Sequence, residues 1–266
     1  MSKKVLAIGF AIALVAAFLV YNSGAMREAR LIKALVAQNI EARGGGDAWQ
    51  AVDSLRLSGR MYLGQGMDVP YVMEQKRPGK MCLEFVFDEE TATQCVDGNS
   101  GWKLLPFQGR YEPEAMTKKE FHDMADSAAI DGLLINSFRQ GYQIEWLGSE
   151  VVAGRTTTKL QVKLPGGATR WIYIDEETGL DVKVDSMRML RGKETRVETF
   201  YYDWQATDGL LIPRRQETHT EGREGSNFLT VDGVITNPPI DDSRFSMPAS
   251  ACLLYTSDAA DECVNV

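Results

Sequence analysis

The sequence predicts an α+β fold, in which a curved antiparallel β-sheet of about ten or eleven strands is capped by two or three helices. Hydrophobic residues alternate with polar residues through most of the chain, which is the period of half-buried strands. Glycine-rich turns separate these runs at short intervals, and short connections join antiparallel neighbours. Helical periodicity occurs before the first strand and once more in the middle of the chain.

The first 25 residues are expected to be a signal peptide or an N-terminal membrane anchor. Lys3 and Lys4 precede an apolar run at 5–20, and the small residues Ser23 and Ala25 suit cleavage by signal peptidase. The run is shorter than the roughly 20 apolar residues of a typical membrane-spanning helix. Either form carries the rest of the chain out of the cytoplasm, so we expect a periplasmic protein, either cleaved and free or anchored in the inner membrane by its N-terminus.

The last residues, 251–266, are expected to be a non-native tail. From Cys252 onward the sequence matches the translation of an adaptor used in sequencing libraries. Residues 26–250 are therefore predicted to form one domain, which retains two of the four cysteines, Cys82 and Cys95.

Four segments carry helix signals. An amphipathic pattern predicts a helix over 26–42, and Asp47 is a plausible N-cap for a short helix through residue 52. A helix over 116–128 starts with Thr117 and Glu120 in the spacing of a capping box. Residues 131–139 are predicted to form a second short helix or an ordered loop.

The strand signals begin at residue 54. Runs with a period of two, or apolar runs bounded by turn residues, predict strands at 54–63, 68–76, 81–88, 91–96, 102–106, 142–150, 155–164, 168–175, 180–190, 194–204, 210–222 and 226–235. No internal repeat or long linker divides them.

The alternation places a set of large apolar side chains on one face of the sheet. The candidate cavity residues are Leu57, Met61, Met73, Leu83, Phe85 and Phe87, with Trp102, Leu104, Trp171 and Tyr173 expected to join them. In a closed sandwich these residues would be core. In an open half-barrel some of them would line a cavity for acyl chains, where methionine adapts to ligands of variable shape.

Two cysteines are candidates for a disulfide. If Asp88 and Glu89 form a two-residue turn, Cys82 and Cys95 lie directly opposite each other on adjacent strands. Opposite Cβ atoms are about 4.5–5.5 Å apart, close to the spacing that a disulfide needs, and an oxidising compartment favours the bond. The alternative is a pair of free thiols.

The residues give little support to catalysis, to a metal site or to a cofactor. The net charge of −8 argues against nucleic-acid binding. His122 and His219 are the only histidines, and they lie in no metal-binding or nucleophile motif. Glycines 44–46 are expected to end a helix and not to bind phosphate.

The layout resembles the LolA/LolB-like family of periplasmic lipoprotein-sorting proteins, particularly its uncharacterised "outer membrane lipoprotein-sorting" relatives. The segments that carry the resemblance are 71–81, 97–102, 173–180, 203–213 and 240–245, which are turn-rich pieces spread over most of the mature chain. The resemblance implies an unclosed antiparallel half-barrel with helices on its concave face, enclosing an apolar cavity for acyl chains. No individual ligand-contacting residue is implied.

These observations lead to three functional hypotheses. The first is a non-catalytic periplasmic carrier or binding protein for lipids or lipoprotein acyl chains. The second is an envelope-stress or regulatory module of the same fold whose partner is another envelope protein, which a retained membrane anchor would favour. The third is an enzyme of unknown type, which would need a converging polar cluster inside the cavity.

Overall fold

The computed structural model describes residues 24–62, 64, 67–125, 127–190 and 192–248. The predicted signal segment up to residue 23 and the predicted tail at 251–266 lie outside these residues. Within the described part of the chain, no helix combines the length and the apolar character needed to cross a membrane.

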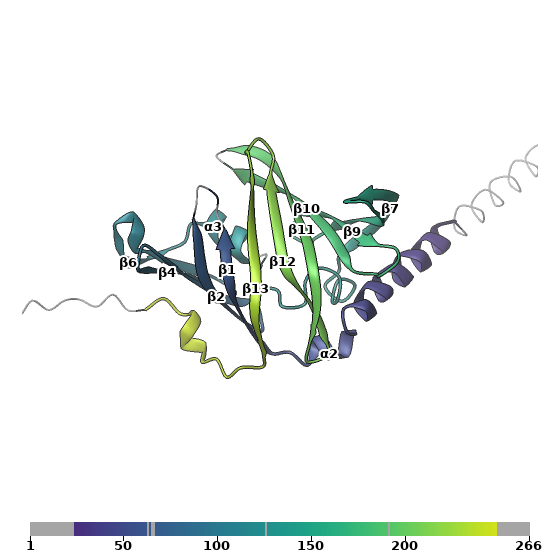
Figure 1. Cartoon of the computed structure of the whole chain (residues 1–266). Coiled ribbons are helices and arrows are strands. Elements are labelled where there is room, and N and C mark those ends of the chain that lie inside the picture. The colour runs from purple at the N-terminus through teal and green to yellow at the C-terminus, as the bar shows by residue number, and fades with distance from the viewer. Residues whose placement is uncertain (1–23, 63, 65–66, 126, 191, 249–266) are drawn as a thin grey trace, which may run out of the picture.

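The described residues form one sheet of 13 strands in the order β6-β5-β4-β3-β2-β1-β13-β12-β11-β10-β9-β8-β7. Figure 1 shows the sheet curving around its helices, with β6 and β7 at opposite edges. The strands are β1 (Ser54–Tyr62), β2 (Asp68–Lys76), β3 (Lys80–Phe87), β4 (Glu90–Val96), β5 (Gly101–Leu105), β6 (Arg110–Ala115), β7 (Gln143–Val152), β8 (Arg155–Lys163), β9 (Thr169–Asp175), β10 (Asp181–Leu190), β11 (Lys193–Thr207), β12 (Leu210–Thr220) and β13 (Ser226–Thr236).

The predicted fold class is confirmed: the sheet is antiparallel, curved and unclosed. Its 13 strands exceed the ten or eleven expected, and β6 was not predicted. β6 is a mostly exposed edge strand of sequence RYEPEA, so it has neither the apolar alternation nor the freedom from proline of an inner strand.

The helices lie on the concave face. The described part of the N-terminal helix covers 24–42, followed by α2 (Gly46–Gln50) and α3 (Lys118–Ala125). The capping box of α3 is confirmed, since the Thr117 amide donates to Glu120 Oε2 at 2.8 Å and the Glu120 amide donates to Thr117 Oγ1 at 3.3 Å. Asp47 lies in the first turn of α2, whose N-cap is Gly45.

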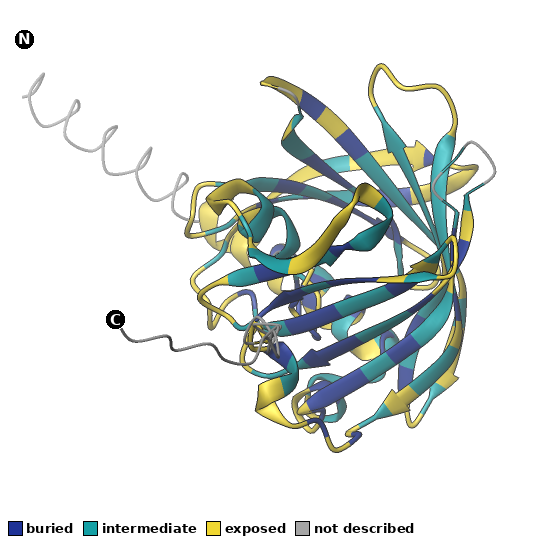
Figure 2. Cartoon of the chain, turned by 90° about the vertical axis from the view of Figure 1, so that its left-hand side faces the viewer, coloured by how far each residue is buried: buried dark blue, intermediate teal, exposed yellow. Residues whose placement is uncertain are grey.

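The stretch at 130–141 forms consecutive turns, which agrees with the ordered-loop alternative and not with a second helix. Ile130, Leu134 and Ile135 from this stretch are buried against the concave face. Figure 2 shows that buried residues line the strands of the curved sheet, whereas exposed residues gather at turns and edges.

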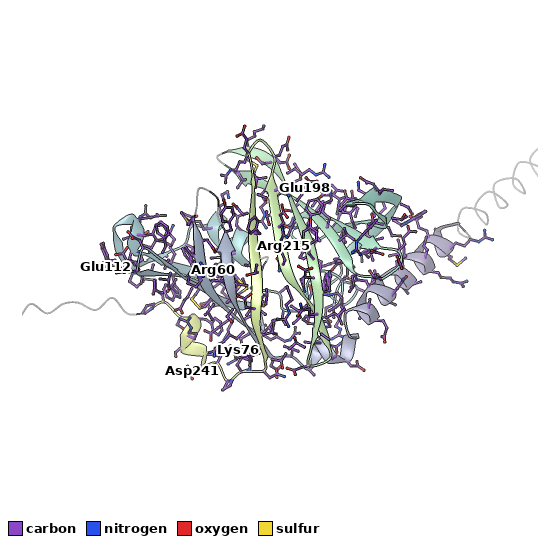
Figure 3. The ribbon with its side chains drawn as sticks, viewed as in Figure 1. Arg60, Lys76, Glu112, Glu198, Arg215 and Asp241 are labelled. Atoms are coloured by element: carbon purple, nitrogen blue, oxygen red, sulfur yellow. A yellow bond between two sulfur atoms is a disulfide. The ribbon has the colours of Figure 1, made fainter. Side chains whose placement is uncertain are left out.

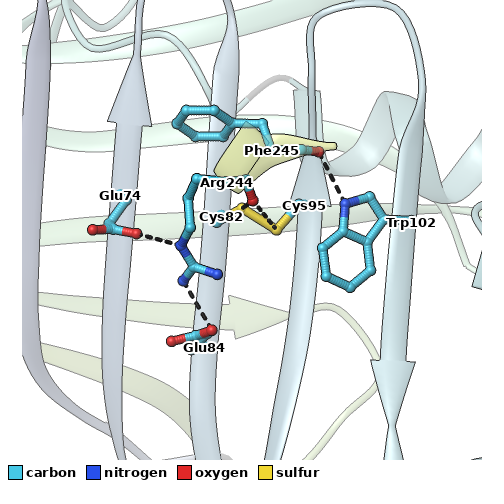
Figure 4. Close-up of a disulfide and its surroundings, with 7 residues drawn as sticks. All are labelled: Glu74, Cys82, Glu84, Cys95, Trp102, Arg244 and Phe245. Atoms are coloured by element: carbon cyan, nitrogen blue, oxygen red, sulfur yellow. Dashed lines mark hydrogen bonds and ion pairs between the residues drawn. A yellow bond between two sulfur atoms is a disulfide. The ribbon is translucent and has the colours of Figure 1, made fainter. Parts of the chain in front are cut away.

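The outer face of β2–β5 is crossed by residues 237–248, here called the C-terminal strap, which contains the 3₁₀ helix η2 (Asp242–Phe245). Arg244 Nε donates to Glu74 Oε2 at 2.7 Å, and Arg244 Nη2 lies 2.9 Å from Glu84 Oε1. Trp102 Nε1 donates to the Phe245 carbonyl oxygen at 2.9 Å. These contacts tie the strap to β2, β3 and β5 (Figure 4).

A disulfide joins β3 to β4 beneath the strap. Cys82 pairs directly with Cys95 in the antiparallel register, their Cα atoms are 4.1 Å apart, and the S–S distance is 2.02 Å. The turn that sets this register has positive φ angles at Asp88 and Glu89, as a tight two-residue hairpin requires. Both cysteines are fully buried.

Charge at the edge of the strap is balanced. Burial alone would raise the pKa of Glu74, but hydrogen bonds from Arg244 and Arg56 hold this pKa below its ordinary value. Lys76 and Lys80 lie at 2.7 Å and 2.9 Å from the Asp242 carboxylate. Lys76 and Asp241 mark this corner of the molecule in Figure 3.

We predict that Phe245→Ala lowers the free energy of unfolding by about 3–5 kcal/mol, because the ring is 1% exposed and its removal leaves a cavity over the disulfide. Met247→Ala in the same strap is the matched control, because that side chain is 46% exposed. Urea unfolding measures both changes. Equal losses would show that the strap does not pack as described.

Candidate functional site

The strand registers place six of the predicted cavity residues on the concave face. Leu57 pairs with Met73, and Met73 pairs with Leu83. Residues directly opposite each other on antiparallel strands point to the same face. The same argument, along each strand with period two, places Met61, Phe85 and Phe87 on that face.

All of these side chains except Leu57 belong to an apolar surface over β1–β5 and β13, here called the open basin. Its buried residues are Met61, Val69, Tyr71, Phe85, Ala92 and Leu105, and its partly exposed residues are Met67, Met73, Leu83, Phe87, Phe107 and Leu229. The Phe107 ring borders the surface, with its centroid 5.9 Å from that of Phe85 and 5.5 Å from that of Phe87.

The open basin differs from the other apolar clusters of the concave face in what covers it. Within the described residues, the cluster around Leu57 is closed by Trp49 of α2, the cluster around Leu160 by the N-terminal helix, and the cluster around Met81 by Phe121 of α3. The open basin contains no α-helix residue, although Met73 at its border also packs against the clusters closed by α2 and α3. From outside the strands it gains only Met67 and Phe107, which belongs to a short 3₁₀ helix. Half of its apolar side chains are partly exposed, with no α-helix of the described residues in front of them.

Several residues of the open basin were not predicted from the sequence. Val69 and Tyr71 follow the same alternation as Met73 in β2, so an extension of that pattern would have found them. Leu229 occupies β13, which pairs with β1 although some 170 residues separate the paired positions, for example Arg60 and Thr230. Phe107 lies in the 3₁₀ helix η1 (Pro106–Gln108), where no periodic pattern exists.

Trp102 and Leu104 do not join this surface. Trp102 pairs with Cys95 and Leu104 with Thr93, which places both side chains on the outer face. Trp102 packs there against the strap and the disulfide. The expectation is wrong for these two residues because alternation within a strand does not fix its phase relative to the preceding strand.

Trp171 and Tyr173 also lie on the outer face. Their neighbours Ile172 and Ile174 pack under the N-terminal helix, so the alternate positions point away from it. Tyr173 is enclosed by Lys159 and Lys183, whose Nζ atoms lie 4.9 Å and 4.3 Å from the ring centroid.

The rest of the outer face is charged and aromatic. Arg215 lies over both Tyr202 and Phe228, at 5.4 Å and 5.5 Å from the ring centroids, and Figure 3 labels it beside Glu198 on the neighbouring strand. The buried carboxylate of Asp185 has two partners: Lys183 Nζ lies 3.2 Å from it, and the Tyr173 hydroxyl donates to it at 2.9 Å. This network satisfies charges on the outside of the sheet and leaves the concave face to apolar contacts.

The wing of the sheet opposite the open basin, formed by β7–β10, is a filled core. Leu160 and Val162 of β8 are fully buried, and Ile172 of β9 is 1% exposed. Ile32 and Val36 of the N-terminal helix cover them from the concave side. The apolar surface of this wing is therefore covered by a helix.

A buried polar cluster fastens the end of the N-terminal helix to the sheet. Asn39 donates to the Gly179 carbonyl oxygen at 2.9 Å and to Asp181 at 3.1 Å. Arg43 donates to the Asp131 carbonyl oxygen at 3.0 Å. Burial raises the pKa of Asp181, and burial together with the Asp181 charge raises the pKa of Tyr201 to about 12.

Neither histidine lies in this cluster. His122 is on α3 beside Phe121, and His219 Nε2 lies 3.1 Å from Glu217 on the outer face. The described ranges contain no group of three or more His, Cys, Asp and Glu residues arranged to hold a metal ion.

No protein-family model and no curated protein matches the sequence. Solved structures do share its fold. A DUF1329 family protein from Desulfovibrio piger superposes with a TM-score of 0.57 at 12% sequence identity, over 80% of this chain and 96% of that one. A putative outer membrane lipoprotein-sorting protein domain from Vibrio parahaemolyticus gives 0.54 at 14% identity, over 79% and 94% of the two chains.

A LolA superfamily protein from Nitrosomonas europaea gives a TM-score of 0.54 at 13% identity, over 79% of this chain and 97% of that one. At identities of this size, the superpositions establish a common fold and leave the function to be argued from the site. The expected LolA-like fold is thus confirmed: this chain has the fold of the LolA-like proteins.

We predict that replacing leucine by alanine lowers the free energy of unfolding by different amounts in the wing formed by β7–β10 and in the open basin. Leu160→Ala should lower the free energy of unfolding by about 2–5 kcal/mol, because it opens a cavity in a filled core. Leu83→Ala should cost no more than about 1 kcal/mol, because water already reaches that side chain. Denaturant unfolding of the two variants measures the difference. A cost at Leu83 as large as that at Leu160 would mean that the open basin is ordinary core.

Proposed function

We propose that this protein binds the acyl chains of lipids or of lipoproteins in the open basin and carries them without catalysis. The observation that supports the proposal is an apolar concave surface, in a LolA-like fold, that contains no α-helix residue among the described residues. A monomeric protein seldom leaves a large apolar surface in water without a use for it.

The physical basis of binding is burial of hydrocarbon. Each methylene group removed from water contributes about 0.8 kcal/mol, so one acyl chain can supply useful affinity without polar recognition. Met61, Met67 and Met73 contribute flexible, polarisable side chains to the surface. Such side chains adjust to chains of different length and saturation.

We place this function in the periplasm. The basic and apolar N-terminal segment has the pattern of an export signal. The disulfide between Cys82 and Cys95 suits an oxidising compartment. Membrane contact would be transient for a cleaved carrier, or would occur through the N-terminal segment if that segment is retained.

Carriage of this kind requires neither a cofactor nor a reacting group. The ligand enters and leaves through the exposed side of the open basin, and its release to a partner depends on the relative affinities of the two proteins. An acylated partner is accepted through its hydrocarbon chains, so the basin serves lipids and lipoproteins alike.

The test compares two glutamates introduced on opposite faces of the same strand. Leu83→Glu places a charge in the open basin, and we expect it to weaken binding of a fluorescent fatty acid by at least about tenfold, because burying an unpaired carboxylate is costly. Val86→Glu is the matched control: Val86 is also in β3 but is 39% exposed on the outer face.

Fluorescence titration of the wild type and both variants gives the affinities, and circular dichroism verifies that both variants are folded. Equal binding by the two variants would contradict the proposed location. Absence of binding by the wild type would contradict the proposed function.

A further inference from the structure

In the described part of the chain, the C-terminal strap covers the disulfide on the outer face of the sheet. Cys82 and Cys95 form one buried cluster with Phe245 of the strap and Trp102 of β5. The carbonyl oxygen of Arg244 lies 3.2 Å from Cys82 Sγ and 3.9 Å from Cys95 Sγ, as Figure 4 shows. Behind the two sulfur atoms is the sheet itself. A reagent that approaches from the outer face therefore meets the strap before it meets either sulfur.

The strap is attached to the sheet by side chains and not by a strand ladder. Among the described residues, no backbone–backbone hydrogen bond joins the strap to the sheet past Asn237. The carbonyl oxygens of the strap instead accept hydrogen bonds from three side chains of the sheet, which are those of Ser54, Lys76 and Trp102. The strap can therefore leave the sheet without breaking any hydrogen bond between strands, which is the kind of local opening that occurs below the free energy of global unfolding.

One strap residue supplies charged contacts to two strands. The Arg244 guanidinium lies 2.7 Å from the carboxylate of Glu74 in β2 and 2.9 Å from that of Glu84 in β3. Hydrogen bonds between charged groups are roughly twice as strong as neutral ones. The Arg244 side chain lies apart from the apolar cluster around the sulfur atoms, and Glu74 keeps Arg56 as a second partner. Loss of this side chain therefore weakens docking of the strap and leaves the disulfide cluster itself unaltered.

Thiol–disulfide exchange requires direct access to one of the two sulfur atoms. A thiolate of a dithiol attacks one Sγ and forms a mixed disulfide, while the S–S bond breaks and the other Sγ leaves as a thiolate that takes up a proton. The second thiolate of the reagent then displaces the remaining cysteine, which leaves two cysteine thiols and an oxidised dithiol. Oxidation follows the same steps in reverse. Because both cysteines are fully buried, neither direction can proceed while the strap is docked.

We propose that the C-terminal strap gates thiol–disulfide exchange between Cys82 and Cys95 and an external dithiol or disulfide reagent. The bond is formed and reduced through local opening of residues 237–248, and not through unfolding of the domain. Arg244 follows Cys82 by 162 residues, so the β3–β4 hairpin is synthesised before the strap. The hairpin is thus oxidised first, and the strap then closes over the finished bond. The exchange site is separate from the open basin, so this inference does not depend on the proposed function.

The test measures the rate at which dithiothreitol reduces the disulfide in the native, full-length chain. Samples are quenched with an alkylating reagent, and mass spectrometry follows alkylation of the tryptic peptide 81–103, which carries both Cys82 and Cys95. Arg244→Ala should accelerate reduction by about tenfold or more, because losing the charged contacts raises the population of the open strap. Met247→Ala is the matched control in the same strap and should leave the rate unchanged, because that side chain is exposed.

A second control separates opening of the strap from unfolding of the domain. Leu160→Ala destabilises the opposite wing, and its disulfide should be reduced at the wild-type rate in the absence of denaturant. The wild-type rate should also rise with urea much less steeply than the unfolding equilibrium does, because opening of the strap exposes little surface. An unchanged rate in Arg244→Ala would overturn the inference. Equal acceleration in Leu160→Ala would also overturn it, because reduction would then proceed through global unfolding.

Discussion

Covering the concave face of a single 13-stranded sheet is the constraint on which the rest of this structure depends. The inner side chains of such a sheet are apolar along most strands, and apolar surface gains stability only where something packs on it. The helices and the turns at 130–141 supply that cover over the wing formed by β7–β10 and over part of the central strands β1, β12 and β13. Among the described residues, no α-helix covers the part of β1–β5 that carries Met61, Phe85 and Ala92, which leaves the open basin partly exposed.

Contacts on the outer face of β2–β5 hold the floor of the open basin in place. The disulfide joins β3 to β4, Arg244 bridges carboxylates of β2 and β3, and Trp102 ties β5 to the strap. These contacts lie directly behind Leu83 and Phe85. A surface that has no α-helix of the described residues packed in front of it is thereby braced from behind.

Local signals in the sequence were sufficient for much of this fold. Thr117 and Glu120 predicted the start of α3 because a capping box involves residues three apart. The two-residue turn at Asp88 and Glu89 fixes the register of β3 and β4, so Cys82 opposite Cys95 followed from counting. The basin residues of β1–β3 followed from alternation along strands joined by short turns.

The wrong predictions have a common physical origin: some connections between strands do not fix which residues of the next strand face inward. Residues 97–100 separate β4 from β5, and residues 116–142 separate β6 from β7, which leads into β8 and β9. Each interruption resets which side chains face inward, so Trp102 and Tyr173 were assigned to the wrong face. The position of the helices was also beyond local pattern, because it depends on contacts such as Asn39 with Gly179, 140 residues apart. The extent of the open basin could therefore not be predicted.

The most direct measurement of the central claim is methyl NMR of the methionines during titration with a diacyl phospholipid. Met61 and Met73 lie on the open basin, whereas Met187 and Met189 lie on the outer part of β10, where Met187 pairs with Arg196 and Met189 is 49% exposed. Acyl-chain binding in the basin predicts shifts of the Met61 and Met73 methyl signals with Met187 and Met189 unchanged. Unchanged signals at Met61 and Met73, or shifts confined to Met187 and Met189, would contradict it.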